Sequence, residues 1–234
     1  MPEHINLSRL ILNPRSRQVR SELADPYELH RTIWRAFPQG AFNVNRQDHA
    51  AAGVLFRVEV HPRTGVPTLL VQSRQMPDWS FLLGPGKSYL LPADELPLEV
   101  DNPAVKAVVV GFHAGQVLAF RLRANPTVKK DREGEKQGRR VGLFREEDQL
   151  KWLARKIELA GGALLSARTS NEENTKGMLF VEKEDKKRMR FLSVQFDGVL
   201  QVKDPAALEQ ALQAGIGSGK GLGFGLLSLA PARG

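Results

Sequence analysis

The chain has 234 residues, of which 41% are apolar, so it can form one large domain or two small ones of roughly 100 residues each. It contains no cysteine, which excludes disulfides, cysteine-based zinc sites and thiol nucleophiles. The 34 lysines and arginines exceed the 26 aspartates and glutamates, for a net charge of +8. No signal-peptide pattern and no run of about 18 apolar residues is present, so we expect a cytoplasmic protein without membrane segments.

The first half begins with a predicted strand and a well-marked helix. Asp25 is an N-cap residue followed by Pro26 at the first helical position and Glu28 at the third, which predicts a helix running to Phe37. Strands are predicted over residues 5–12, 54–60, 68–72 and 105–112. The proline-rich stretch 77–104 is expected to be irregular, with one short helix at most.

The second half repeats this order of elements. Strands are predicted over 117–123 and 226–229, with a hairpin of 191–196 and 199–202 that turns at Asp197-Gly198. Helices are predicted over 146–160, ended by Gly161-Gly162, and from Asp204-Pro205 to Ala214. Both halves therefore read βαββαβ, which predicts an α+β fold of two tandem ferredoxin-like (RRM-like) domains, residues 1–114 and 115–234.

Positive charge is concentrated in the second half. Residues 121–145 hold nine basic and three acidic side chains, and a second basic cluster follows near residue 188. Such clusters indicate either a polyanion partner or charged loops that are simply solvated. The residues expected to contact RNA are Arg121, Arg123, Lys129, Lys130, Arg139, Arg140, Lys186, Lys187, Arg188, Arg190 and Lys220.

Tyr27 and His30 are neighbours at i, i+3 on the predicted first helix, and Arg31 adjoins them. Histidine, tyrosine and arginine suit cleavage of RNA by its own 2′-hydroxyl, which needs proton transfer and positive charge near the phosphate but no metal. The alternative is that His30, which falls within the apolar arc of the helix, is a hydrogen-bonded core residue. Helical spacing alone leaves both interpretations open.

A glycine-rich segment precedes the last strand, with glycine at every second residue: Gly215, Gly217, Gly219, Gly221, Gly223 and Gly225. It is not a P-loop, because Ala214 and Gly221 stand where that motif needs Gly and Ser or Thr. The segment either holds an RNA backbone through its amides and Lys220 or serves close packing. No H-x-x-x-H or H-E-x-x-H motif is present, so neither a metal nor a small-molecule cofactor is expected.

Several segments in order along the chain resemble the CasE-type CRISPR RNA endonucleases of type I-E systems. The arginine-rich run 120–126 and the terminal glycine segment are the most specific of them. The matching segments are 10–14, 25–32, 70–73 with 76–79, 120–126, Trp152-Leu153 with Lys156, 196–200 and 215–231.

The resemblance implies tandem ferredoxin-like domains and a metal-independent endoribonuclease that cleaves CRISPR precursor RNA at the base of the repeat stem-loop. The expected products are a 2′,3′-cyclic phosphate and a 5′-hydroxyl. The resemblance also implies retention of the product as a subunit of the Cascade complex, with other Cascade proteins as partners. His30 corresponds to the family's catalytic histidine and Tyr27 to its assisting tyrosine, and Arg31 is expected to offset developing charge. A non-catalytic RNA-binding subunit is the alternative.

Overall fold

The computed structural model describes residues 4–37, 53–96, 100–130, 139–170, 178–182 and 188–232. Its internal contacts divide the chain into two compact units, one of Met1–Val110 with Lys220–Gly223 and one of Gly111–Gly219 with Phe224–Gly234. The segment Lys220–Gly223 therefore groups with the first unit, although the rest of the glycine-rich segment belongs to the second. Among the helices of the described residues, none is long and apolar enough to span a bilayer.

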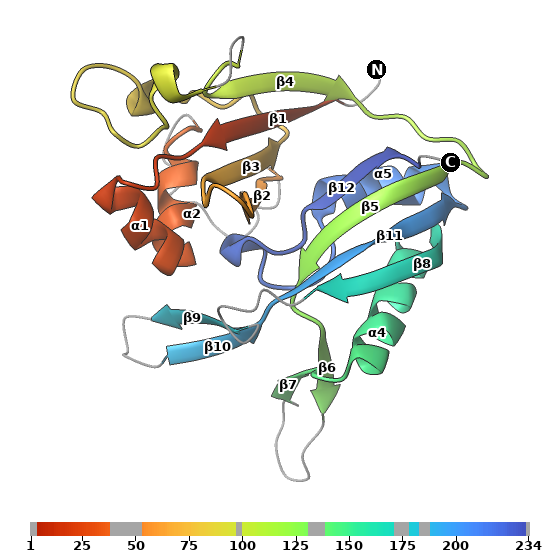
Figure 1. Ribbon diagram of the computed structural model, residues 1–234. Helices are drawn as coiled ribbons and strands as arrows, with labels where there is room; N and C mark the ends of the chain where they lie inside the picture. The colour runs from red at the N-terminus through yellow and green to blue at the C-terminus, as the bar shows by residue number, and fades with distance from the viewer. Residues whose placement is uncertain are drawn as a thin grey trace. The chain divides into compact units, whose positions relative to one another are not determined.

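The first unit is built on a four-stranded antiparallel sheet in the order β2-β3-β1-β4 (Figure 1). Its elements are β1 (His4–Ile11), α1 (Arg17–Ala24), α2 (Pro26–Trp34), β2 (Leu55–Val60), β3 (Pro67–Ser73) and β4 (Ala104–Val109). Between β3 and β4 the described residues form only two short 3₁₀ turns, η2 (Ser80–Leu82) and η3 (Ala93–Glu95). The irregular character of the stretch 77–104 was thus predicted correctly. In a full βαββαβ order, the second helix would lie where these two turns are found.

Helix α2 is fixed by its own first turn. The Asp25 side chain accepts a hydrogen bond from the Tyr27 backbone N–H at 3.0 Å, and Pro26 occupies the first helical position, as predicted. The helix ends at Trp34, with Arg35 to Phe37 in turns rather than helix. Leu29 and Ile33 are buried in the core with residues of α1 and of the sheet, so α2 covers one face of β1, β2 and β3.

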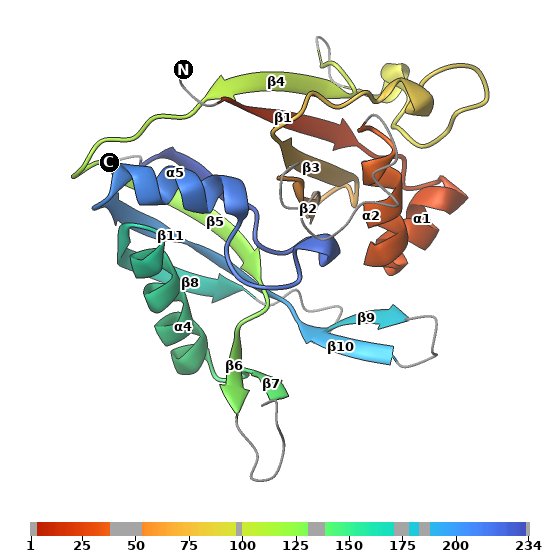
Figure 2. The same ribbon diagram turned by 180° about the vertical axis from the view of Figure 1, so that it is seen from behind.

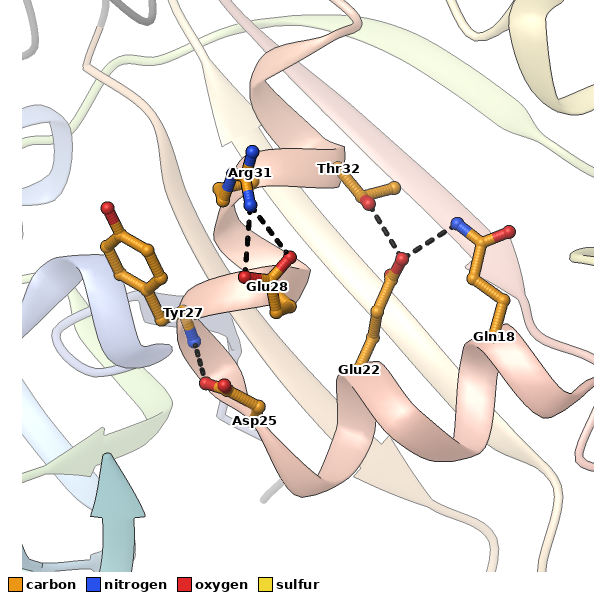
Figure 3. Close-up of polar contacts among 7 residues, drawn as sticks. All are labelled: Gln18, Glu22, Asp25, Tyr27, Glu28, Arg31 and Thr32. Atoms are coloured by element: carbon orange, nitrogen blue, oxygen red, sulfur yellow. Dashed lines mark hydrogen bonds and ion pairs between the residues drawn. The ribbon is translucent and has the colours of Figure 1, made fainter. Parts of the chain in front are cut away.

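Helix α1 is absent from the sequence prediction because its sequence is polar and buries only Val19 and Glu22. Its contact with α2 is polar: the Glu22 carboxylate accepts hydrogen bonds from Gln18 and Thr32, each at 2.8 Å (Figure 3). The hydroxyl of buried Tyr89 donates a third bond to the same carboxylate at 2.5 Å. Burial, followed by this bond to Glu22, raises the pKa of Tyr89 well above its ordinary value.

The second unit holds a four-stranded antiparallel sheet in the order β12-β5-β11-β8, the same relative order as in the first unit. Helices α4 and α5 lie against one face of it (Figure 2). Two short antiparallel pairs, β6/β7 and β9/β10, extend from this unit. The elements are β5 (Val117–Ala124), β6 (Thr127–Lys130), β7 (Arg139–Gly142), α4 (Glu146–Leu159), β8 (Gly162–Ser170), β9 (Met178–Glu182), β10 (Arg188–Leu192), β11 (Val194–Val202), α5 (Pro205–Ala214) and β12 (Leu227–Pro231).

The predicted hairpin turn at Asp197-Gly198 is wrong. Both residues lie inside the continuous strand β11, where Gly198 pairs with Phe120 of β5 and Ala167 of β8. A Cβ at Gly198 would lie 2.2 Å from the Ser166 carbonyl oxygen and 2.8 Å from the Phe120 ring. Glycine is needed here for close approach within the sheet, next to a register shift at Val199, and not for a turn. The second strand of the βαββαβ order is β8, which the sequence prediction missed.

Candidate active site

The imidazole of His30 is held by an aromatic neighbour on its own helix. The indole N–H of Trp34 donates a hydrogen bond of 2.6 Å to His30 Nε2. The two rings meet edge-on, with centroids 5.8 Å apart and planes at 82°. His30 is only half-buried, whereas Trp34 is 5% exposed. A rigid buried donor therefore fixes the orientation of a partly accessible imidazole.

Two further elements of the first unit contact the same ring. Phe56 of β2 stacks on His30 at a centroid distance of 6.1 Å and an angle of 26°. The 3₁₀ turn η4 (Lys220–Leu222) packs against α2 and β2. A Cβ at Gly221 would lie 3.5 Å from His30 Cε1 and 3.6 Å from Nε2, so the backbone of η4 lies close against the ring. Residues far apart in the chain thus converge on His30.

Tyr27 and Arg31 lie on more exposed parts of α2. Tyr27 is 52% exposed, and its ring projects from the side of α2 away from the Glu22–Thr32 contact (Figure 3). The Arg31 guanidinium donates to both carboxylate oxygens of Glu28, at 3.1 and 3.2 Å. Arg31 therefore shares its charge with an acidic neighbour, a contact that the sequence interpretation did not include.

Lys220 is the cationic residue of η4, the turn that packs against α2. Partial burial of its ammonium group lowers the pKa of Lys220 from its ordinary value. The segment 220–223 thus carries a partly desolvated positive charge in the same unit as His30.

The glycines around η4 have two distinct roles. A left-handed φ occurs at Gly215, Gly217, Gly219, Gly223 and Gly225, but not at Gly221. At Gly219 a Cβ would also lie 2.8 Å from the Phe224 ring. The packing alternative for this segment therefore has direct support at Gly219, whereas Gly221 lies against His30 with an ordinary backbone conformation.

In the second unit, predicted RNA-binding residues line a groove of about 330 Å³. Lys129 and Arg140 are cross-strand partners in β6/β7, and they share the groove with Trp152, Lys156 and Ser218. The Lys156 ammonium lies 5.9 Å from the centre of the Trp152 ring. Cationic groups next to an aromatic ring are typical of nucleic-acid contacts.

The remaining predicted RNA-binding residues of the second unit lie on β5 and on or beside the short strand pairs β6/β7 and β9/β10. Arg121 donates to Asp197 at 2.6 Å and Arg123 to Ser193 at 2.8 Å, so both have partners within the second unit. Lys186 and Lys187 lie outside the described residues. Lys130, Arg139, Arg188 and Arg190 lie on described strands, but their side chains are outside the description. In the part of the chain that is described, no group of three or more His, Asp or Glu side chains could hold a metal ion.

Comparison with known proteins gives a family for this arrangement. The profile of the family described as "CRISPR associated protein" matches residues 5–231. The chain belongs to this family. It is 35% identical over 232 residues to the CRISPR-associated endoribonuclease Cse3 of Thermus thermophilus, with 96% of this chain and 99% of that protein covered. It is 34% identical over 214 residues to the Cascade subunit CasE of Escherichia coli, at 88% and 92% coverage.

Solved structures show the same likeness in three dimensions. One is a structure of Thermus thermophilus Cse3 bound to an RNA that represents a pre-cleavage complex. It matches this chain with a TM-score of 0.75 and 32% identity, covering 97% of this chain and all of that one. The expected resemblance to CasE-type proteins and the tandem α+β fold are therefore confirmed.

Two residues at His30 were not predicted as part of the site. Trp34 follows His30 by four residues, so helical spacing would have placed it beside the histidine. Phe56 lies 26 residues away on a strand, and no local pattern in the sequence connects it to α2.

Proposed function

We propose that this chain is an endoribonuclease that cleaves CRISPR precursor RNA at the base of the repeat stem-loop and retains the product as a Cascade subunit. The observation that carries the proposal is the match over 97% of the chain to a relative whose structure contains an RNA representing a pre-cleavage complex. The relative named as the Cascade subunit CasE supports the proposed assembly. The cytoplasm remains the proposed location.

We further propose that cleavage needs no metal. The RNA 2′-oxygen attacks the adjacent phosphorus, the bond from phosphorus to the 5′-oxygen breaks, and a 2′,3′-cyclic phosphate and a 5′-hydroxyl result. His30 assists transfer of the proton lost by the 2′-hydroxyl or gained by the 5′-oxygen. Tyr27 positions the scissile phosphate. The Arg31 guanidinium, which also binds the Glu28 carboxylate, offsets the negative charge of the phosphate. Support comes from the orientation of the His30 imidazole by Trp34, Phe56 and Gly221.

The proposed binding surface has a basic part in each unit. Lys129 and Arg140, with Lys156, supply a groove for the RNA backbone in the second unit. Lys220 supplies a cation on the turn that packs against the His30 helix. The other predicted basic residues of β5, β6, β7 and the β9/β10 region are proposed to extend this surface.

Cleavage of a CRISPR repeat RNA in excess chelator tests metal independence. We expect the rate to be unchanged by the chelator. We also expect a 2′-deoxy nucleotide before the cut to block cleavage while binding persists, because the nucleophile is then missing. Loss of cleavage in chelator would contradict the proposed mechanism.

Replacement of His30 tests whether the chain is an enzyme. His30→Ala should lower the single-turnover cleavage rate by roughly 100-fold or more, since proton transfer contributes 10²–10⁴-fold. Binding of the 2′-deoxy RNA should be preserved. His113→Ala is the matched control, because His113 is an exposed histidine of the second unit, and it should cleave like the wild type.

The second candidate is a non-catalytic RNA-binding subunit. The Trp34–His30 hydrogen bond favours this candidate, because a histidine that accepts a hydrogen bond from a buried indole is also typical of a structural core residue. In that case the wild type would bind repeat RNA without cleaving it, and His30→Ala would lower the free energy of unfolding.

A further inference from the structure

The hydrogen bond between Trp34 and His30 defines which nitrogen of the imidazole carries a proton. An indole N–H is only a donor, so the bond of 2.6 Å requires a lone pair on His30 Nε2. An imidazole with a lone pair on Nε2 carries its proton on Nδ1 and is neutral. The imidazolium ion has N–H on both nitrogens and would place two donors against each other. The geometry therefore selects one tautomer and opposes protonation.

The donor is held in place independently of the histidine. Trp34 is 5% exposed and belongs to the core of the first unit, where its ring packs against Phe37 with centroids 5.7 Å apart. On the histidine side, Phe56 and the backbone at Gly221 restrict the ring. The packing around both rings therefore favours this bond in the resting protein.

We propose that Trp34 is a positioning residue that keeps His30 neutral, with its proton on Nδ1, so that the free enzyme holds His30 in its proton-accepting form. This inference rests on the proposed function, in which His30 transfers a proton during RNA cleavage. It deepens that function by assigning the state in which His30 enters the reaction. Nε2 has a single lone pair, so His30 can take the proton lost by the RNA 2′-hydroxyl at this nitrogen only when the indole hydrogen bond breaks.

The test must hold constant the other ionisable groups on α2 and on the neighbouring elements of the first unit. Trp34→Phe leaves all of these groups in place, so a change in His30 titration reports the loss of the indole. The ionisable side chains of α2 besides His30, and those of α1, β2 and η4, are Tyr27, Glu28, Arg31, Arg17, Arg20, Glu22, Arg57, Glu59 and Lys220.

Nitrogen NMR of His30 in the RNA-free protein gives a direct test. In the wild type we expect the proton on Nδ1 and an unprotonated Nε2 at neutral pH. Trp34→Phe removes a bond that favours the neutral form, so the apparent pKa of His30 should rise by roughly half to one pH unit. The acidic limb of the single-turnover cleavage profile should move to higher pH by the same amount.

Trp79→Phe is the matched control. Trp79 is also a buried tryptophan of the first unit, and its indole N–H donates to Ser8 Oγ at 3.0 Å. Its replacement should cost similar stability without moving the titration of His30. The Trp34 indole proton resonance in the wild type is a further readout that needs no variant, because it should shift as His30 becomes protonated.

The outcomes separate this inference from the proposed function. A proton on Nε2 in the wild type, or equal His30 titration in the Trp34 and Trp79 variants, would overturn the inference even if RNA is cleaved. The expected tautomer and shift without any RNA cleavage would retain the role of Trp34 and overturn the proposed function.

Discussion

At the scale of single residues, the carboxylate of Glu22 is the polar centre of the first unit. It is 6% exposed and accepts hydrogen bonds from Gln18, Thr32 and Tyr89, which lie on α1, on α2 and ahead of η3. A buried carboxylate is tolerated only when donors replace water. This small cluster explains how a helix as polar as α1 is retained against the core.

The raised pKa of Tyr89 predicts a specific loss of stability at high pH. The unfolded tyrosine ionises near pH 10, whereas the buried one stays protonated. The stabilisation is thus complete below about pH 10 and is lost as pH rises above it, by roughly 1.4 kcal/mol per pH unit. Urea denaturation from pH 9 to 11 measures this loss, and Tyr89→Phe should flatten it.

The chain offers its own control for this prediction, because Tyr27 is its only other tyrosine and is 52% exposed. Tyr27→Phe should leave the pH dependence of the free energy of unfolding as it is in the wild type. Equal profiles for the Tyr27 and Tyr89 variants would contradict the assignment to the Tyr89–Glu22 bond.

At the scale of elements, two glycines of the glycine-rich segment are expected to have different roles, one in folding and the other in RNA cleavage. Gly219 has φ 79° and no room for a Cβ beside Phe224, whereas Gly221 has an ordinary φ and a Cβ added there would lie at van der Waals distance from His30. Gly219→Ala should lower the free energy of unfolding by about 1–3 kcal/mol. Gly221→Ala should fold like the wild type but slow RNA cleavage, because its methyl group occupies space next to the imidazole.

Thermal denaturation and single-turnover cleavage of both variants give the comparison. If Gly221→Ala lowers the free energy of unfolding but leaves the cleavage rate of the folded protein unchanged, Gly221 serves only packing, as Gly219 does. Gly65→Ala is a reference for the cost of the backbone conformation alone, since Gly65 has a left-handed φ but open space around its Cβ position.

Local signals account for the elements that the sequence predicted correctly. Asp25-Pro26 and Asp204-Pro205 cap α2 and α5 as expected, because N-capping depends on a few adjacent residues. Helix α1 was missed because its sequence is polar and its buried Glu22 is hydrogen-bonded to Tyr89, 67 residues away. Gly198 was misread as a turn because a glycine required by a neighbouring strand looks the same in sequence as one required by a bend.

The candidate site was predictable only in part for the same reason. Tyr27, His30 and Arg31 were predicted from one helix and a family resemblance, whereas Trp34 was not predicted, although the same helical spacing places it beside His30. The contacts of His30 with Phe56 and Gly221 come from the tertiary fold, across 26 and 191 residues of chain. Sequence patterns carry no signal for contacts at that separation.

At the scale of the whole molecule, the net charge of +8 predicts that RNA affinity depends on salt. Removing one lysine or arginine that binds a phosphate should lower the slope of log affinity against log salt by roughly 0.7–0.9. Lys129, Arg140 and Lys156 line one groove of the second unit. Replacing any one of them by alanine should therefore reduce the slope by roughly 0.7–0.9. Fluorescence anisotropy with 2′-deoxy-blocked repeat RNA at several salt concentrations measures it.

Lys151→Ala is the control for charge alone. Lys151 lies on the same helix as Lys156, is exposed and pairs with Glu147 at 2.5 Å. Its removal lowers the net charge by the same amount but leaves the lining of the groove intact, so the salt slope should stay at the wild-type value. If the Lys151 and Lys156 variants show the same reduction in slope, RNA responds to overall charge and the groove is not its binding surface. A wild-type affinity independent of salt would exclude backbone contacts as the source of binding altogether.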